Sequence, residues 1–237
     1  SPTLKERIPR AQLPALTHLI LVGGSPAAPE RNTGFAEASP AAADEVSYEQ
    51  LMADAPDWVE PEWLTLDDGL IIHYTSGSTG KSKGALHRQH AMVGHYQTSL
   101  WALDLRDDDV YWLTADPGWV TGTSYGIYGP WTLGISSVVI GGRFDPKRWY
   151  ETIQRYQVTM WYSAPTAFRM LMAAGAEIPR QYKLGSLRHI CSVGEPLNPE
   201  ALRWVKQVTG IAPHETWWMT ETVMQLVCNY RSMDFKI

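Results

Sequence analysis

The segment with the clearest chemical potential is the glycine-, hydroxyl- and lysine-rich run Tyr74–Gly84, YTSGSTGKSKG. Its three glycines let the backbone approach a ligand closely and turn N–H groups inward. Its hydroxyl groups and two lysines add donors and positive charge. These properties suit a polyphosphate. A flexible linker is the weaker interpretation, because the run lies between an apolar strand-like stretch at 69–73 and a helix-like stretch that begins near His87.

Two familiar phosphate-binding patterns do not fit this run. The Walker pattern needs a glycine five positions before Gly80-Lys81-Ser82, and Thr75 occupies that position. The dinucleotide fingerprint also fails, because the glycines stand at positions 77, 80 and 84. A P-loop NTPase is therefore disfavoured, and ATP hydrolysis without any carboxylic acid would be needed to revive that interpretation.

The run does resemble the phosphate-loop signature of the adenylate-forming (AMP-binding) enzymes, a hydroxyl- and glycine-rich run that ends in Lys-x-Lys-Gly. Four later segments follow in the order expected for the short-chain acetyl-CoA synthetases of that superfamily. They are Ala115–Gly122, Trp161–Ala167, Ser192–Asn198 and Glu215–Thr222. The resemblance is strongest from Leu70 to the C-terminus. It implies ATP-dependent activation of a short carboxylate, with coenzyme A as the acceptor.

The resemblance assigns roles to residues of these segments. The phosphates of ATP would be bound by Thr75, Ser76, Gly77, Ser78, Thr79, Gly80 and Lys81. The adenine and the rest of the nucleotide would contact Gly194, Glu195, Pro196, Glu215, Thr216 and Trp217. Joining a carboxylate to the α-phosphate brings two anions together, so a divalent cation is needed. Thr220 and Glu221 offer hard oxygen ligands and are the catalytic candidates that would hold Mg²⁺.

The size of the acid depends on Trp218 in this interpretation. In the family an indole at this position closes the acyl pocket, and the remaining wall would come from Trp119, Val120, Thr121 and Val193. Acetate is therefore favoured, with propionate or 3-hydroxypropionate as alternatives. The chain has 11 tryptophans, so packing alone is the competing role for Trp218 until its Thr-Trp-Trp-Met-Thr-Glu context is considered.

Composition excludes several other classes. The net charge of −5 and the absence of a Lys/Arg run give no support to nucleic-acid binding. The apolar run Leu19–Val22 is too short for a membrane span, so no membrane association is expected. Cys191 and Cys228 form neither a disulfide framework nor a metal-ligand set, which favours a cytoplasmic protein acting on small molecules.

The hydrophobic pattern predicts an α/β fold with a mainly parallel sheet flanked by helices. Strands are expected at 16–22, 70–74, 110–114, 136–140, 158–163 and 187–193, and helices at 87–103, 146–156, 165–174 and 199–208. Residues 1–66 would be the remnant of a preceding subdomain, including a Pro/Ala-rich loop at 23–43, and residues 67–237 the nucleotide-binding core.

The resemblance also implies that the chain is a central part of a longer ligase. The lysine-bearing C-terminal domain of the family, a ribose-binding aspartate and the main coenzyme A contacts are expected to lie outside this sequence. The isolated chain is then expected to be inactive, and a nucleotide-binding module without turnover is the alternative function. Two departures from the family pattern are Ser82, where proline is common, and Val223, where glycine is usual.

Four further features invite other interpretations that we disfavour. Gly122–Gly126 matches the G-x-S-x-G pattern of hydrolases, but no strand-to-helix context is expected there. His87, His90 and His95 could share a helix face, yet no other ligands stand at zinc-site spacing. Glu195 is assigned no acid–base role, and Cys191 is expected to be a buried, inert thiol.

Overall fold

The computed structural model describes residues 16–22, 44–76 and 80–232. The chain divides into two units, residues 1–63 and residues 64–237. In the first unit, strand β1 (His18–Leu21) pairs in parallel with β2 (Asp44–Ser47), and helix α2 (Tyr48–Asp54) follows directly. The Ser47 hydroxyl caps this helix by accepting a hydrogen bond from the Gln50 amide at 3.3 Å. The loop expected at 23–43 lies outside the described residues.

The second unit is built on a sheet whose described strands run in the order β10–β9–β8–β7–β5–β6. These strands are β5 (Val110–Leu113), β6 (Ser136–Val138), β7 (Met160–Ser163), β8 (His189–Ser192), β9 (His214–Trp217) and β10 (Val227–Cys228). All pairings are parallel except that of β10 with β9. Every residue of β7 and β8 is buried, as expected for a sheet covered on both faces. The mainly parallel α/β fold is confirmed.

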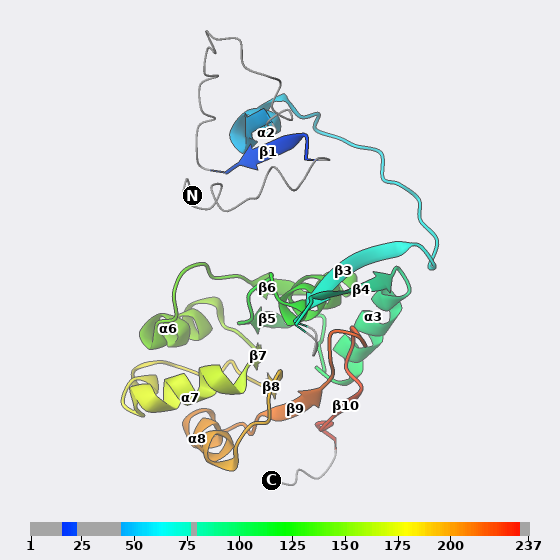
Figure 1. Cartoon of the computed structure of the whole chain (residues 1–237). Coiled ribbons are helices and arrows are strands. Elements are labelled where there is room, and N and C mark those ends of the chain that lie inside the picture. The colour runs from blue at the N-terminus through cyan, green and yellow to red at the C-terminus, as the bar shows by residue number, and fades with distance from the viewer. Residues whose placement is uncertain (1–15, 23–43, 77–79, 233–237) are drawn as a thin grey trace, which may run out of the picture. The chain divides into compact units, whose positions relative to one another are not determined.

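Helices α6 (Pro146–Tyr156), α7 (Pro165–Ala174) and α8 (Pro199–Thr209) cover one face of the sheet (Figure 1). Each begins with a proline, which suits the first helical turn because no N–H is needed there. Trp112, Trp161 and Ile190 project from three neighbouring strands into the core beneath these helices. The predicted bounds of α6 and α7 match the observed ones, and α8 is one residue longer than predicted. A short 3₁₀ turn, η3 (Pro179–Gln181), follows α7.

The other face carries α3 (Ala91–Trp101) and a continuous helical segment made of α4 (Val120–Thr123), the π-helical η2 (Ser124–Tyr128) and α5 (Gly129–Thr132). Successive strand residues point to opposite faces, so Tyr111, Tyr162 and Cys191 pack on this side together with Tyr125 of η2. Burial raises the pKa of the Cys191 thiol well above its ordinary value, in agreement with an inert role.

The helical segment also removes the hydrolase interpretation. Ser124 lies inside it and is fully buried, whereas a nucleophile elbow exposes its serine on a turn between a strand and a helix. The backbone of Asp116 lies 2.0 Å from where a Cβ on Gly122 would stand. Gly122 is therefore required by close backbone packing rather than by a nucleophile.

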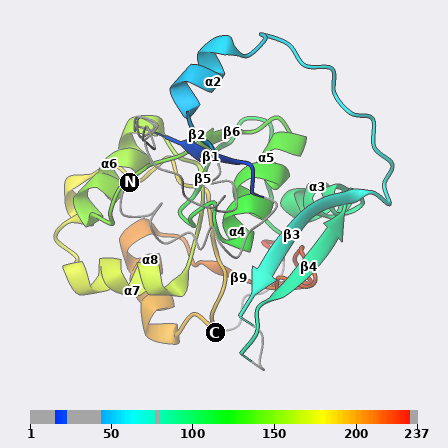
Figure 2. The ribbon, with the colours of Figure 1, turned by 45° about the horizontal axis from the view of Figure 1, so that its top comes forward.

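Strands β3 (Gly69–Thr75) and β4 (Lys83–Arg88) form an antiparallel hairpin beside α3 (Figure 2). The prediction that a helix begins at His87 is wrong, because α3 begins only at Ala91. In β4 the His87 side chain is buried while Leu86 and Arg88 are exposed, which is the two-residue period of a strand. The glycine-rich run therefore connects two strands, not a strand and a helix.

Several elements had no prediction from the sequence, namely β2, β4, β9, β10, α2, α4, η2, α5 and η3. Most are four residues long or shorter, too short for a periodic pattern to stand out. Across the described ranges, no helix combines the length and the apolar character that crossing a bilayer requires.

Candidate active site

The predicted phosphate loop lies at the tip of the β3–β4 hairpin. Thr75 and Lys83 pair across the two strands and close the loop. Ser76, Gly80 and Lys81 are exposed, and Gly80 has a φ of +84°, a backbone conformation that favours glycine. The predicted ligands Gly77, Ser78 and Thr79 lie outside the described residues.

The inner face of the hairpin carries two buried histidines. His73 on β3 and His87 on β4 are 9% and 7% exposed, and their ring centroids are 5.4 Å apart. Burial lowers the pKa of both, and for His87 the backbone of Thr220 and the charge of Glu221 oppose that shift. The hairpin that carries the phosphate loop therefore packs against the turn that contains both predicted magnesium ligands.

Hydrogen bonds hold the turn that contains Thr220 and Glu221 in place. The buried His95 ring donates a hydrogen bond through Nε2 to the Val223 carbonyl, 2.9 Å away. Val223 has a φ of +59°, in the left-handed region that β-branched residues rarely adopt, so the position where glycine is usual keeps a glycine-like backbone. The Thr222 hydroxyl donates to the Met219 carbonyl at 2.9 Å. Glu221 itself is exposed, which leaves its carboxylate accessible to a cation.

Histidines 87, 90 and 95 do not share a helix face, because His87 lies in β4, His90 in the following turn and His95 in α3. In the part of the chain that the structure describes, histidine, cysteine and acidic residues form no group of three that could hold a metal ion. A magnesium ion needs no such cage, because it is usually bound by one or two carboxylates together with phosphates and water. Glu221 and Thr220 fit that mode of binding.

A cavity of about 370 Å³ is lined by residues of the Ser192–Asn198 and Glu215–Thr222 motifs. Its lining includes every residue that the resemblance assigned to adenine and nucleotide, together with Trp218: Gly194, Glu195, Pro196, Glu215, Thr216, Trp217 and Trp218. Val227, Cys228 and Asn229 complete it, and no sequence motif pointed to these three. The turn after β8 begins at Gly194, whose φ is +98°. The described residues of the phosphate loop do not line this cavity.

Hydrogen bonds to two carboxylates hold the wall of this cavity in place. Glu195 accepts hydrogen bonds from the amide and the hydroxyl of Thr166 and from Arg169, whose Nη2 is 2.7 Å from Oε2. The Thr166 hydroxyl, followed by Arg169, lowers the pKa of Glu195, so this carboxylate stays ionised and paired. Glu215 accepts from the Leu197 amide at 2.8 Å. Both acids therefore accept hydrogen bonds that hold the cavity wall.

The predicted acyl-pocket residues are distributed between buried and exposed positions. Trp218 is half-buried and packs on the same cluster as the buried Val193. Val120 and Thr121 are half-buried at the start of α4, whereas Trp119 leaves 73% of its surface exposed. Tyr125 contacts the Trp218 indole edge-on, with ring centroids 5.2 Å apart.

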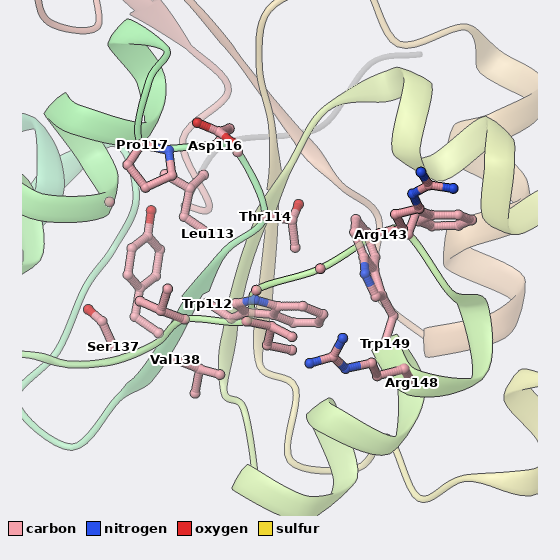
Figure 3. A pocket seen from close by; sticks show the side chains of 18 residues that line it. Trp112, Leu113, Thr114, Asp116, Pro117, Ser137, Val138, Arg143, Arg148 and Trp149 are labelled. Atoms are coloured by element: carbon pink, nitrogen blue, oxygen red, sulfur yellow. The ribbon is translucent and has the colours of Figure 1, made fainter. Parts of the chain in front are cut away.

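A second cavity, of about 430 Å³, lies along β5 and the edge strand β6. Arg148, Trp112 and Trp149 surround one part of it and Asp116 another (Figure 3). The two indoles meet edge-on, with centroids 5.3 Å apart. Only Ala115, Asp116 and Pro117 of this lining belong to a motif singled out in the sequence, and no cavity was predicted along β6.

Comparisons with known proteins agree with the geometry. A family model described as "AMP-binding enzyme" matches residues 11–236. The acetyl-coenzyme A synthetase of Bacillus subtilis is 51% identical over 236 residues, covering 100% of this chain and 39% of that protein. The synthetase of the same name from Pyrobaculum aerophilum is 47% identical over 184 residues, covering 74% of this chain and 28% of its own length.

Among solved structures, an acyl-CoA synthetase of Brucella canis superposes with a TM-score of 0.75 and 33% identity, over 85% of this chain and 36% of that one. The chain thus spans well under half of the curated relatives it matches, 39% of the Bacillus subtilis protein and 28% of the Pyrobaculum aerophilum protein.

Proposed function

Because this chain belongs to the family of AMP-binding enzymes, we propose that the complete polypeptide carrying it activates a short carboxylic acid with ATP and transfers the acyl group to coenzyme A. The observation that carries the proposal is the 370 Å³ cavity, where the predicted adenine turn and the predicted nucleotide strand meet beside Trp218. Motifs about 20 residues apart in sequence would line one nucleotide pocket in this way.

The adenylation step of the proposed reaction would use residues of this chain. The loop from Thr75 to Lys81 would direct backbone N–H groups and an ammonium group at the outer phosphates. An oxygen of the acid attacks the α-phosphorus, the bond to pyrophosphate breaks, and an acyl-AMP forms. Thr220 and Glu221 would hold a magnesium ion, which supplies charge neutralisation at the phosphates. The thiol sulfur of coenzyme A then attacks the acyl carbon and AMP leaves.

The packing of Trp218 favours acetate as the acid, with propionate or 3-hydroxypropionate as alternatives. Trp218 lies against buried aromatic residues, so the indole has little room to move aside for a longer chain. We place the reaction in the cytoplasm, which the two free thiols Cys191 and Cys228 support, because reducing compartments preserve free cysteines.

The direct test is acid-dependent exchange of pyrophosphate into ATP by the complete polypeptide. We expect exchange with acetate, weaker exchange with propionate, and none without an acid. Absence of exchange with every short acid would overturn the proposal, and ATP hydrolysis without an acid would favour an NTPase. Calorimetry with ATP and AMP on the 237-residue chain tests the alternative of a binding module. We expect weak or undetectable affinity there, and tight binding would favour a module without turnover.

Replacing Trp218 with alanine is expected to shift the preference from acetate toward longer acids. Removing the indole opens room for further methylenes, each of which changes selectivity by roughly 10- to 200-fold. The measurement is kcat/KM for acetate, propionate and butyrate. Trp131→Ala is the matched control, since Trp131 is a 69% exposed tryptophan on α5 and should leave the ratios unchanged. Equal losses for all acids in the Trp218 variant would contradict a role in acid size.

A further inference from the structure

Two hydrogen-bond relays begin at the buried residue Gln225, and the first runs from its backbone. The Gln225 amide donates to the Tyr125 hydroxyl at 2.8 Å, and Tyr125 lies 2.8 Å from the Thr98 hydroxyl. The Thr98 hydroxyl donates its proton to the Gly94 carbonyl, 2.7 Å away. Tyr125 must therefore donate to Thr98 and accept from Gln225, because each hydroxyl has a single proton.

The second relay runs from the Gln225 side chain. Its Nε2 donates to the Tyr162 hydroxyl at 3.2 Å, and that hydroxyl lies 2.6 Å from the Thr216 hydroxyl. Thr216 donates to the Ser192 carbonyl at 2.9 Å, so Tyr162 must donate to Thr216. Burial raises the pKa of Tyr162 well above its ordinary value, which keeps the phenol protonated for this purpose. The remaining lone pair of the Tyr162 oxygen is free for another donor.

Trp218 packs on the cluster that contains the tyrosines of both relays. Its ring packs edge-on against Tyr125, and Tyr125 packs in turn against Tyr162 with centroids 6.1 Å apart. The indole Nε1 is buried without a hydrogen-bond partner, and Trp218 packs on the cluster that contains Tyr162, whose raised pKa the Trp218 side chain opposes. An unpaired buried donor is costly, and the Tyr162 oxygen is the acceptor that the relay leaves available to it.

We propose that Tyr162 and Gln225 are positioning residues that fix the Trp218 indole and thereby set the length of acid that the pocket accepts. The inference rests on the proposed function. The relay leaves a lone pair on the Tyr162 oxygen, inside the cluster on which Trp218 packs, and the Tyr125 ring packs edge-on against the indole. The Gln225 side-chain amide must present its N–H group to Tyr162. In the flipped orientation its oxygen would face the Tyr162 oxygen, whose single proton is donated to Thr216.

The test compares Tyr162→Phe and Gln225→Met with Tyr111→Phe in the complete polypeptide. Tyr111 is a matched control, since its hydroxyl is equally buried in the same cluster, on the neighbouring strand, without a partner and outside the relay. In the two relay variants we expect the butyrate-to-acetate ratio of kcat/KM to rise by about 5- to 20-fold, within the range that one methylene can contribute.

A purely structural role predicts a different result. Lost stability would lower kcat for every acid in parallel and leave the ratio unchanged. A positioning role raises KM for acetate and lowers KM for butyrate, with smaller changes in kcat. An unchanged ratio in both relay variants, or an equal rise in Tyr111→Phe, would overturn the inference.

A second measurement does not depend on turnover. In ¹⁵N-tryptophan-labelled protein, assigned with Trp218→Phe, the Trp218 Nε1–H should exchange with water at least about tenfold faster in Tyr162→Phe than in wild type, as local opening becomes easier. Unchanged exchange would refute the positioning role whether or not the protein activates acids. Faster exchange without acid-dependent activity in wild type would instead refute the proposed function alone and retain the contact between Tyr162 and Trp218.

Discussion

Replacing Arg188 with methionine is expected to lower the free energy of unfolding by about 3–5 kcal/mol, the cost of leaving one member of a buried ion pair without its partner. Arg188 donates through Nε to Asp109 and through Nη1 to Asp104, each at 2.8 Å, and the Asp109 side chain is only 1% exposed. Without the guanidinium, the Asp109 carboxylate would remain buried and charged. Its remaining hydrogen bonds would come from the Thr159 hydroxyl and the Arg106 amide.

Urea denaturation of the chain measures this loss, with Arg180→Met as the matched control. Arg180 pairs with Glu177 on the surface, where the two side chains are 66% and 80% exposed, so the control should lose at most about 1 kcal/mol. A difference below about 1 kcal/mol in the free energy of unfolding between the two variants would show that Arg188 stabilises the protein no more than a surface arginine does.

The same pair predicts a pH dependence. Burial alone would raise the pKa of Asp109, but the hydrogen bonds from Arg188, Thr159 and the Arg106 amide outweigh burial and lower it. A carboxyl with a lowered folded pKa stabilises the protein above its unfolded pKa of about 3.9, and this stability is lost as the pH falls through the folded pKa. The advantage of wild type over Arg188→Met should therefore be full near pH 7 and shrink below about pH 4.

This ion-pair cluster also shows where prediction from sequence ends. Arg188 contacts acids 79 and 84 positions earlier, and nothing in the spacing or composition of the chain connects them. The buried strands and the proline-initiated helices were predictable, because their signal lies within one segment. The β3–β4 hairpin was only half predicted, since the residues of β4 also suit a helix and the deciding factor is pairing with β3.

The candidate site, too, could be predicted from the sequence only in part. The sequence predicted site residues within continuous motifs, and the structure brings those of two motifs into one cavity. Tyr125 and Tyr162 were missed as packing neighbours of Trp218, and Gln225 was missed as their hydrogen-bond partner. Tyr162 stands in the Trp161–Ala167 motif, and Tyr125 stands in the G-x-S-x-G pattern that would indicate a hydrolase. Their roles depend on which face of a strand or helix they occupy, and this emerges only when the elements are packed.

Replacing Glu221 with glutamine in the complete polypeptide is expected to reduce acid-dependent pyrophosphate exchange by about 10²- to 10³-fold, the usual cost of losing one electrostatic contact to the reacting groups. Glutamine keeps the size and one oxygen of the side chain but removes the charge that would hold magnesium. Glu221 is exposed, so the free energy of unfolding should change by less than about 0.5 kcal/mol.

Magnesium dependence separates a metal ligand from a residue that only shapes the turn. If Glu221 holds the ion, the glutamine variant should need a higher magnesium concentration for half-maximal exchange, and calorimetry should show weaker ATP binding with magnesium but unchanged binding without it. Glu177→Gln, an exposed acid on the surface beside Arg180, is the control and should behave as wild type. Parallel losses with and without magnesium would assign Glu221 to the architecture of the turn. That turn already has His87 and His95 beneath it, so a residue on its exposed side is free to serve a ligand.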